Sequence, residues 1–183
     1  MEFSLVDVVY RQEGDPMVKI KWLILLSALT LLIACSKENE IQTLTAPSPE
    51  QKLVTNEQGL TFSILEDQYE EGMPLFHTKV KNDSKSIYEY GEYYQIEVLK
   101  NDEWYTLTHS DSVFYENPHF TNLGNLIAPG KEIQQSFSVE TLGVTLVPGQ
   151  YRLVKIFLTP IAPYYTITLA VPFTVTSKHR APE

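Results

Sequence analysis

From Gly59 onward the sequence consists of short runs in which apolar and polar residues alternate, with turn residues between them. Alternation of this kind has the period of a β-strand that buries one face. No stretch of ten or more residues carries an apolar stripe at helical spacing, so we expect no substantial helix. The alternating runs are 60–65, 76–80, 94–98, 104–107, 133–139, 151–157 and 165–175.

Turn signals separate these runs. Asn101-Asp102 joins two of them as a hairpin, and Pro129-Gly130 and Pro148-Gly149 each precede another. Seven to eight short strands with turns between them predict an all-β chain, folded as an antiparallel β-sandwich. We place this domain at residues 59–177, followed by a tail of residues 178–183.

The composition narrows the possible functions. The chain has 183 residues, and 14 lysines and arginines stand against 23 aspartates and glutamates, which gives a net charge of −9. A chain this acidic argues against a nucleic-acid partner, because phosphate binding depends on basic patches. The single cysteine excludes an internal disulfide and a zinc site built on cysteines.

The N-terminal part contains an uncharged apolar run of 13 residues, Trp22 to Ala34. A membrane-spanning helix needs ~20 apolar residues, whereas ~7–15 suit the central region of a secretory signal. Lys19 and Lys21 supply the basic flank that such a signal needs. We therefore interpret residues 1–34 as a signal peptide. Residues 1–16 are acidic rather than basic, and we interpret Met17 as the true translation start.

The apolar run ends in Leu32-Ile33-Ala34-Cys35. This sequence resembles the lipobox of bacterial lipoproteins. The resemblance implies cleavage between Ala34 and Cys35 and attachment of acyl chains to the Cys35 thiol. Cys35 would then bind membrane lipid and place the protein on the extracytoplasmic side of the cell membrane. The alternative is an ordinary buried thiol.

Residues 35–58 are mostly polar and contain the stretch Ala46-Pro47-Ser48-Pro49. We expect a lipidated N-terminus followed by a disordered tether. A coil of this length spans ~25 Å from end to end, which would hold the domain away from the lipid headgroups.

Three further segments carry a family resemblance. They are 90–97 with Asp102-Glu103-Trp104-Tyr105, 126–130, and Pro148-Gly149-Gln150-Tyr151-Arg152-Leu153-Val154-Lys155 with its closing run 171–175. Together they resemble the bacterial immunoglobulin-like domain over about residues 59–176. The resemblance implies a sandwich fold and no known reaction.

Two positions can be compared with immunoglobulin-type sandwiches in general. A tyrosine near the start of strand F often donates a hydrogen bond to the chain just upstream, and Tyr151 is in that place. Leu153 is where the second cysteine of the usual disulfide would be. We expect packing to replace the disulfide, with Trp104 as the central core aromatic.

The sequence offers little catalytic chemistry, and we expect neither an enzyme nor a cofactor. His109, Asp111 and His119 share one loop and could form a weak metal or acid–base site, although surface histidines are the simpler interpretation. The acidic turn 66–72 could collect a hard cation, but it lacks the spacing of a calcium-binding loop.

Aromatic residues form the candidate binding surface. We expect Tyr94, Ile96 and Val98 to face the core, and Tyr93, Gln95 and Glu97 to face outward. Tyrosines favour interfaces because a flat apolar ring carries a polar tip, although cross-strand packing would also explain them. The Pro-rich segment 159–164 corresponds to a binding loop of antibody-type domains. The candidate surface residues are Tyr88, Tyr90, Tyr93, Ile161 and Tyr164.

These observations favour a non-catalytic, membrane-anchored module that binds a protein or an envelope component. An inhibitor that presents the loop 159–164 to an extracellular enzyme is the first alternative. A β-sandwich hydrolase or a metal-binding protein is the second.

Overall fold

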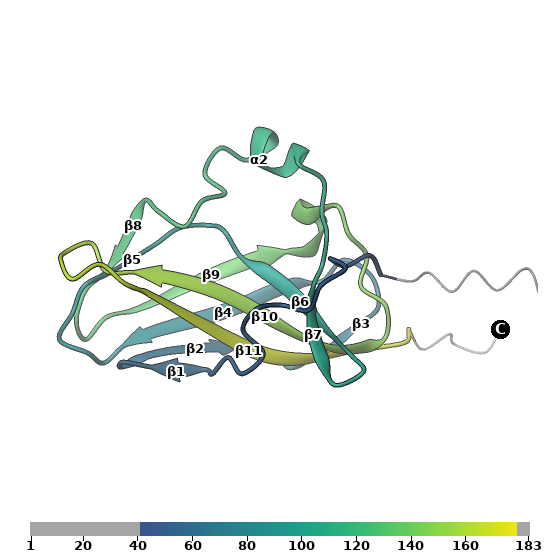
Figure 1. Ribbon diagram of the computed structural model, residues 1–183, viewed down its shortest axis with the longest axis horizontal. Coiled ribbons are helices and arrows are strands. Elements are labelled where there is room, and N and C mark those ends of the chain that lie inside the picture. Colours follow the sequence, from purple (N-terminus) through teal and green to yellow (C-terminus); the bar gives the residue numbers. More distant parts are fainter. Residues whose placement is uncertain (1–40, 179–183) are drawn as a thin grey trace, which may run out of the picture. The chain divides into compact units, whose positions relative to one another are not determined.

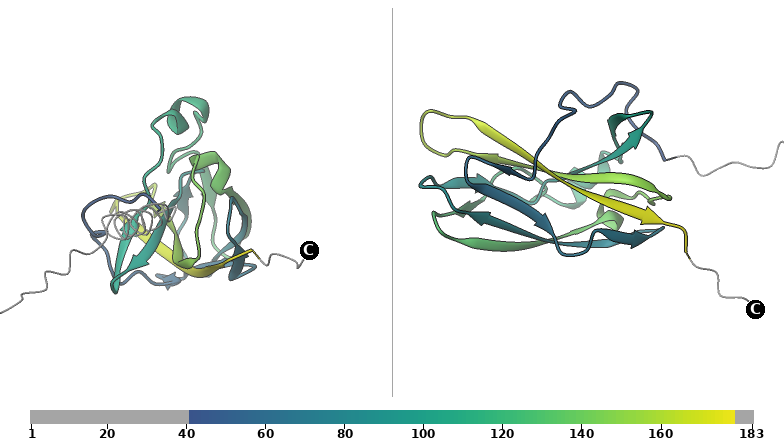
Figure 2. Two further views of the ribbon diagram at one scale, coloured as in Figure 1. Left: turned by 90° about the vertical axis from the view of Figure 1, so that its right-hand side faces the viewer. Right: turned by 90° about the horizontal axis from the view of Figure 1, so that it is seen from below.

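The computed structural model describes residues 41–178, and these form two β-sheets packed face to face (Figures 1 and 2). The predicted signal peptide, Cys35 and residues 179–183 lie outside this range. One sheet has four strands in the order β1-β2-β4-β9. The other has seven: β3-β11-β10-β5-β8 form a path, and β6 pairs with β10 and β7. The strands are β1 Asn56–Glu57, β2 Leu60–Ile64, β3 Gln68–Glu70, β4 Leu75–Asn82, β5 Tyr88–Tyr90, β6 Gln95–Lys100, β7 Glu103–Thr106, β8 Asn125–Ile127, β9 Glu132–Ser138, β10 Gly149–Leu158 and β11 Thr166–Thr176.

The long hairpin of β10 and β11 forms the centre of the larger sheet. Its register runs from Gly149 opposite Val175 to Leu158 opposite Thr166. Alternate side chains of both strands point into the space between the sheets and are fully buried. They meet the inward side chains of β2 and β4, which forms a single core. Core residues from the four strands are Phe62, Phe76, Val80, Tyr151, Leu153, Phe157, Ile167 and Leu169.

This arrangement confirms the predicted antiparallel β-sandwich. The described residues hold eleven strands rather than seven or eight, because β1, β3, β5 and β8 are only two or three residues long. Runs that short show no readable alternation. Among the described residues the helical segments are the short helix α2, Ser112–Glu116, and a 3₁₀ turn at Val139–Leu142. No helix within residues 41–178 has the length and apolarity needed to cross a bilayer.

The largest departure from expectation is residues 41–55, predicted as part of a disordered tether. They run along the free edge of β7 and across the outer face of the larger sheet, and we call them the N-terminal strap. Thr43 bridges Leu107, and the Leu44 amide donates to the Thr106 carbonyl oxygen at 2.9 Å. Further along, the Ala170 amide donates to the Val54 carbonyl oxygen at 3.0 Å. Backbone hydrogen bonds with little apolar patterning hold the strap, so its sequence does not signal that it is ordered.

The strap also explains why Glu97 is buried, although alternation predicted an outward side chain. Glu97 does leave the core face, but the strap covers it together with Arg152 of the neighbouring strand. Arg152 Nε donates to Glu97 Oε2 at 2.5 Å. The same guanidinium donates to the carbonyl oxygens of Gln51 at 3.0 Å and Glu50 at 2.6 Å. The prediction that Tyr94, Ile96 and Val98 face the core is confirmed.

Two aromatic predictions have opposite outcomes. The Tyr151 hydroxyl donates to the Val147 carbonyl oxygen at 2.7 Å, as expected for a tyrosine near the start of strand F. The prediction for Trp104 is wrong, because this residue is half-buried on β7 and its ring packs against the Arg152 guanidinium, 4.6 Å from the ring centroid. The central aromatics are instead Phe62, Phe76, Tyr88, Tyr151 and Phe157.

Candidate functional site

Tyr88 is not part of the candidate surface, because only 1% of it is exposed. It lies on β5 opposite Ile127 of β8, and both side chains point into the core. Neighbouring Glu89 takes the outer face. Strand β5 has only three residues, which is too few for alternation in the sequence to show which side chains face the core. The prediction for Tyr88 failed for this reason.

Tyr90 and Tyr93 are half-buried and pack against other rings. The ring of Tyr90 lies 6.5 Å from that of Phe157 in the core. Tyr93 lies 5.1 Å from Phe120 and 6.5 Å from Phe114, which belong to the long connection between β7 and β8. Burial raises the pKa of the Tyr93 hydroxyl. Tyr90 therefore packs across strands, from β5 to β10, as the packing interpretation expected, whereas Tyr93 packs against the connection between β7 and β8.

Of the five residues predicted to form the candidate surface, Ile161 and Tyr164 are the two that are largely exposed to solvent. Ile161 is 70% exposed and Tyr164 is 77% exposed. Thr159 closes the base of their loop: its Oγ1 donates to the Pro163 carbonyl oxygen at 3.0 Å and accepts from the Tyr165 amide at 2.9 Å. The Thr159 amide donates to the Tyr165 carbonyl oxygen at 3.0 Å. The loop thus presents its apolar tip from a hydrogen-bonded base.

Two further exposed apolar side chains lie at the same end of the sheet as this loop. Leu158 pairs with Glu89, which pairs with Leu126, and Figure 1 shows the loop beside β5 and β8. Leu126 is 62% exposed, and Ile87, two residues before Glu89, is 38% exposed. We call Ile87, Leu126, Ile161 and Tyr164 the end patch. Sequence reasoning missed Ile87 and Leu126, because only strand pairing brings them to the loop.

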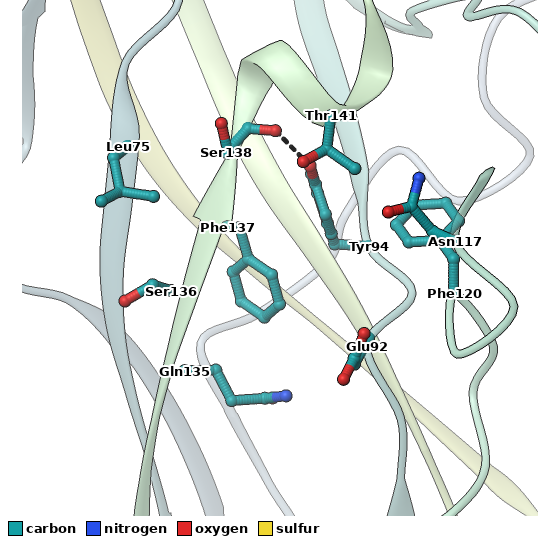
Figure 3. A pocket seen from close by; sticks show the side chains of 10 residues that line it. All are labelled: Leu75, Glu92, Tyr94, Asn117, Phe120, Gln135, Ser136, Phe137, Ser138 and Thr141. Carbon is teal, nitrogen blue, oxygen red and sulfur yellow. Dashed lines mark hydrogen bonds between the residues drawn. The ribbon is translucent and has the colours of Figure 1, made fainter. Parts of the chain in front are cut away.

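A hollow of about 380 Å³ lies where β9 meets the start of β6 (Figure 3). The Tyr94 hydroxyl donates to the Ser138 carbonyl oxygen across it at 2.6 Å, and burial raises the Tyr94 pKa. The Gln135 amide donates to the Gly91 carbonyl oxygen at 3.2 Å, which joins the two walls. These polar groups hold the walls together. The lining residues are Leu75, Glu92, Tyr94, Asn117, Phe120, Gln135, Ser136, Phe137, Ser138 and Thr141.

The loop histidines do not converge on a site. His109 packs its ring against Phe114, with centroids 5.5 Å apart, and its Nδ1 lies 3.1 Å from the Ser110 carbonyl oxygen. Within residues 41–178 no group of three histidine, cysteine, aspartate or glutamate side chains could hold a metal ion. His109, Asp111 and His119 therefore do not form a metal-binding site, and neither do the carboxylates of the acidic turn 66–72.

The element Tyr151-Arg152-Leu153-Val154-Lys155 of β10 has a structural explanation at each polar position. Lys155 is fully buried, and its ammonium donates to the carbonyl oxygens of Gly91 at 2.5 Å and Tyr93 at 2.6 Å. Burial lowers the Lys155 pKa to about 7, although the nearby Glu92 carboxylate opposes this shift. Gly91 must be glycine, because a Cβ there would lie 1.9 Å from the Thr121 carbonyl oxygen. Tyr151, Arg152 and Lys155 thus each tie β10 to a segment outside the sheet core.

A comparison with known protein families identifies the family of this fold. The bacterial Ig-like domain profile matches residues 56–174. The chain belongs to the bacterial Ig-like domain family. Its described part is accordingly an immunoglobulin-like β-sandwich, and no catalytic family is identified. The profile begins at the first strand and so leaves the N-terminal strap of this Ig-like domain outside the match.

Comparisons with individual proteins add no evidence about function. The C-terminal domain of wzt, a crystal structure, is 14% identical to the chain with a TM-score of 0.37. The likeness covers 77% of this chain and 89% of that one. A search of curated proteins found no match.

Proposed function

We propose that this protein is a lipoprotein anchored through Cys35 on the extracytoplasmic side of the cell membrane. Its Ig-like domain serves as a non-catalytic module that binds a protein partner through the end patch. The anchor is supported by the basic flank at Lys19 and Lys21, the apolar run 22–34 and the lipobox Leu32-Ile33-Ala34-Cys35. Acylation with two chains would give stable membrane attachment, whereas one chain gives only marginal binding.

The end patch is the observation that carries the binding role. Large apolar side chains clustered on the surface of a domain mark interaction sites. In the end patch these side chains sit on a loop whose base is fixed by Thr159, so binding costs little additional ordering of the backbone. Tyr164 in particular combines a flat apolar ring with a polar tip, as interface residues do.

Site-specific photocrosslinking in the native membrane tests the binding role. A photoreactive residue replaces Ile161 or Tyr164 in two variants, and Tyr115 in a third. Tyr115 is 85% exposed on α2 and lies outside the end patch, so it is a matched control. We expect one shared crosslinked protein from the first two variants and none from the third. Equal crosslinking at all three positions, or none at the loop, would contradict the proposal.

Anchoring is tested separately by metabolic labelling with a fatty acid. The unsubstituted chain should incorporate the label and sediment with membranes. Cys35→Ser should do neither, because serine offers no thiol for acylation. Labelling that persists in Cys35→Ser would place the modification elsewhere and overturn the anchoring proposal.

The same loop also supports the inhibitor alternative. Its exposed tip and fixed base are the properties of a segment that enters an enzyme cleft without rearranging. This alternative predicts that the partner crosslinked at Ile161 is an enzyme whose activity falls when the purified domain is added. Substitution of Ile161 and Tyr164 by serine should restore that activity, and unchanged inhibition would exclude the loop.

A further inference from the structure

The described part of the chain begins at Ile41, and the strap determines where this part enters the sandwich. The Lys100 ammonium donates to the Ile41 carbonyl oxygen at 3.2 Å. Gln51 fixes the other part of the strap: its side chain accepts from the Trp104 amide at 2.8 Å and donates to the Trp104 carbonyl oxygen at 3.1 Å. Ser48 is buried beneath these contacts, where its amide donates to the same Trp104 carbonyl oxygen at 2.8 Å.

The two ends of the described chain lie at one end of the sandwich, and the loop 159–164 lies at the other (Figures 1 and 2). The strand register agrees with this view. Tyr151 pairs with Val98, which places Lys100 beside Gly149, and Gly149 pairs with Val175. We call the end that contains Ile41, Lys100 and Lys178 the anchor end. The ten residue pairs of the β10–β11 hairpin separate it from the loop by ~33 Å.

We propose that the Ig-like domain rests against the bilayer with its anchor end toward the lipid and its end patch directed away. The inference rests on the proposed acylation of Cys35. Only residues 36–40 then separate the lipid from Ile41, and a link of this length spans at most ~20 Å when fully extended. That reach is shorter than the domain itself. The bilayer that carries the anchor is therefore the surface which this end contacts.

The surface chemistry of the anchor end suits the headgroup layer rather than the hydrocarbon. Exposed Leu65 and Met73 lie there, at 61% and 56% exposure. The acidic turn 66–72 lies between them in the sequence, and its strand β3 pairs with the end of β11, which places the turn at the anchor end. Carboxylates of this turn remain hydrated, since transferring a charge into hydrocarbon carries a large free-energy cost. The acidic turn thus keeps the domain on the membrane surface while the short link keeps it close.

Energy transfer to labelled lipid headgroups tests this orientation in the full acylated protein. The protein is reconstituted into phosphatidylcholine vesicles that carry a headgroup acceptor. Acylated Cys35 offers no free thiol, so a cysteine introduced as Met73→Cys or as Tyr164→Cys takes the donor label alone. We expect transfer from the Met73 position to exceed that from Tyr164 at least about twofold, because ~33 Å separates the two ends.

A longer link provides the matched control. Insertion of ~20 glycine and serine residues between Asn39 and Glu40 adds a coil of ~25 Å and should abolish the difference between the two labels. Equal transfer from both labels in the acylated protein without this insertion would overturn the orientation alone. A chain that mass spectrometry shows to be unacylated, and that does not bind vesicles, would overturn the anchoring proposal as well.

Discussion

At the scale of single residues, Lys155 makes stability depend on pH. Its pKa is about 7 in the folded protein and 10.5 in an unfolded chain. Between these values the unfolded chain binds a proton that the folded chain does not, so the free energy of unfolding rises with pH. The slope approaches ~1.4 kcal/mol per pH unit. Urea unfolding across this range should show the rise, and Lys155→Met should flatten it.

The raised pKa values of buried and partly buried tyrosines act in the opposite direction and limit this rise. Tyr69, with a pKa raised to about 12, stays protonated in the folded protein after the same side chain in an unfolded chain ionises near its ordinary pKa of 10.0. Stability should therefore fall above pH ~10. A stability that is flat from neutral pH to pH ~9 would contradict the role given to Lys155.

The buried pair of Arg152 and Glu97 supports a second residue-scale prediction. Only 3% of Arg152 and 4% of Glu97 is exposed. Arg152→Met should lower the free energy of unfolding by ~3–5 kcal/mol, because it leaves the Glu97 carboxylate buried without its partner. Adding Glu97→Leu should recover most of this loss, as an apolar pair replaces the charged one. Denaturant unfolding of both single variants and the double variant measures the coupling, and strictly additive effects would contradict it.

At the scale of elements, the N-terminal strap should behave as part of the domain. A chain that begins at Asn56, where the family match begins, loses the hydrogen bonds from Glu50 and Gln51 to the Arg152 guanidinium. We expect it to unfold with ~3 kcal/mol less free energy than a chain that begins at Ile41, since hydrogen bonds to charged groups contribute ~1.5–3 kcal/mol each. Equal midpoints in urea would show that the strap adds nothing.

The long and short strands differ in how well the sequence predicts them. The alternating runs predicted the long strands β2, β4, β6, β9, β10 and β11, because one buried face leaves a period of two in the sequence. The short strands β1, β3, β5 and β8 depend on pairing with longer neighbours and leave no such period. For the same reason Ile161 and Tyr164 could be predicted as exposed loop residues, whereas Ile87 and Leu126 join them through the register of β5 and β8.

At the scale of the whole molecule, the end patch and the scaffold should be separable. Ile161→Ser combined with Tyr164→Ser should change the free energy of unfolding by no more than ~0.5 kcal/mol, because both side chains are exposed. The matched core variant Phe157→Ala, on the strand that leads into the loop, should cost ~3–5 kcal/mol. Thermal and urea unfolding compare the two. A large loss from the serine variant would show that the loop tip is structural.

Local sequence patterns were enough to predict the β class, the turns, the hydrogen bond of Tyr151 and a signal-like N-terminal segment. These features depend on neighbours within a few residues, so they are written locally. Only tertiary contacts determine that Glu97 is buried, that Trp104 lies outside the core and that residues 41–55 pack against the larger sheet. Each of these depends on contacts between Gln51, Trp104 and Arg152. Gln51 is 53 residues from Trp104 and 101 residues from Arg152 in the sequence. No local pattern records such contacts, because they exist only once the strands of the larger sheet have come together.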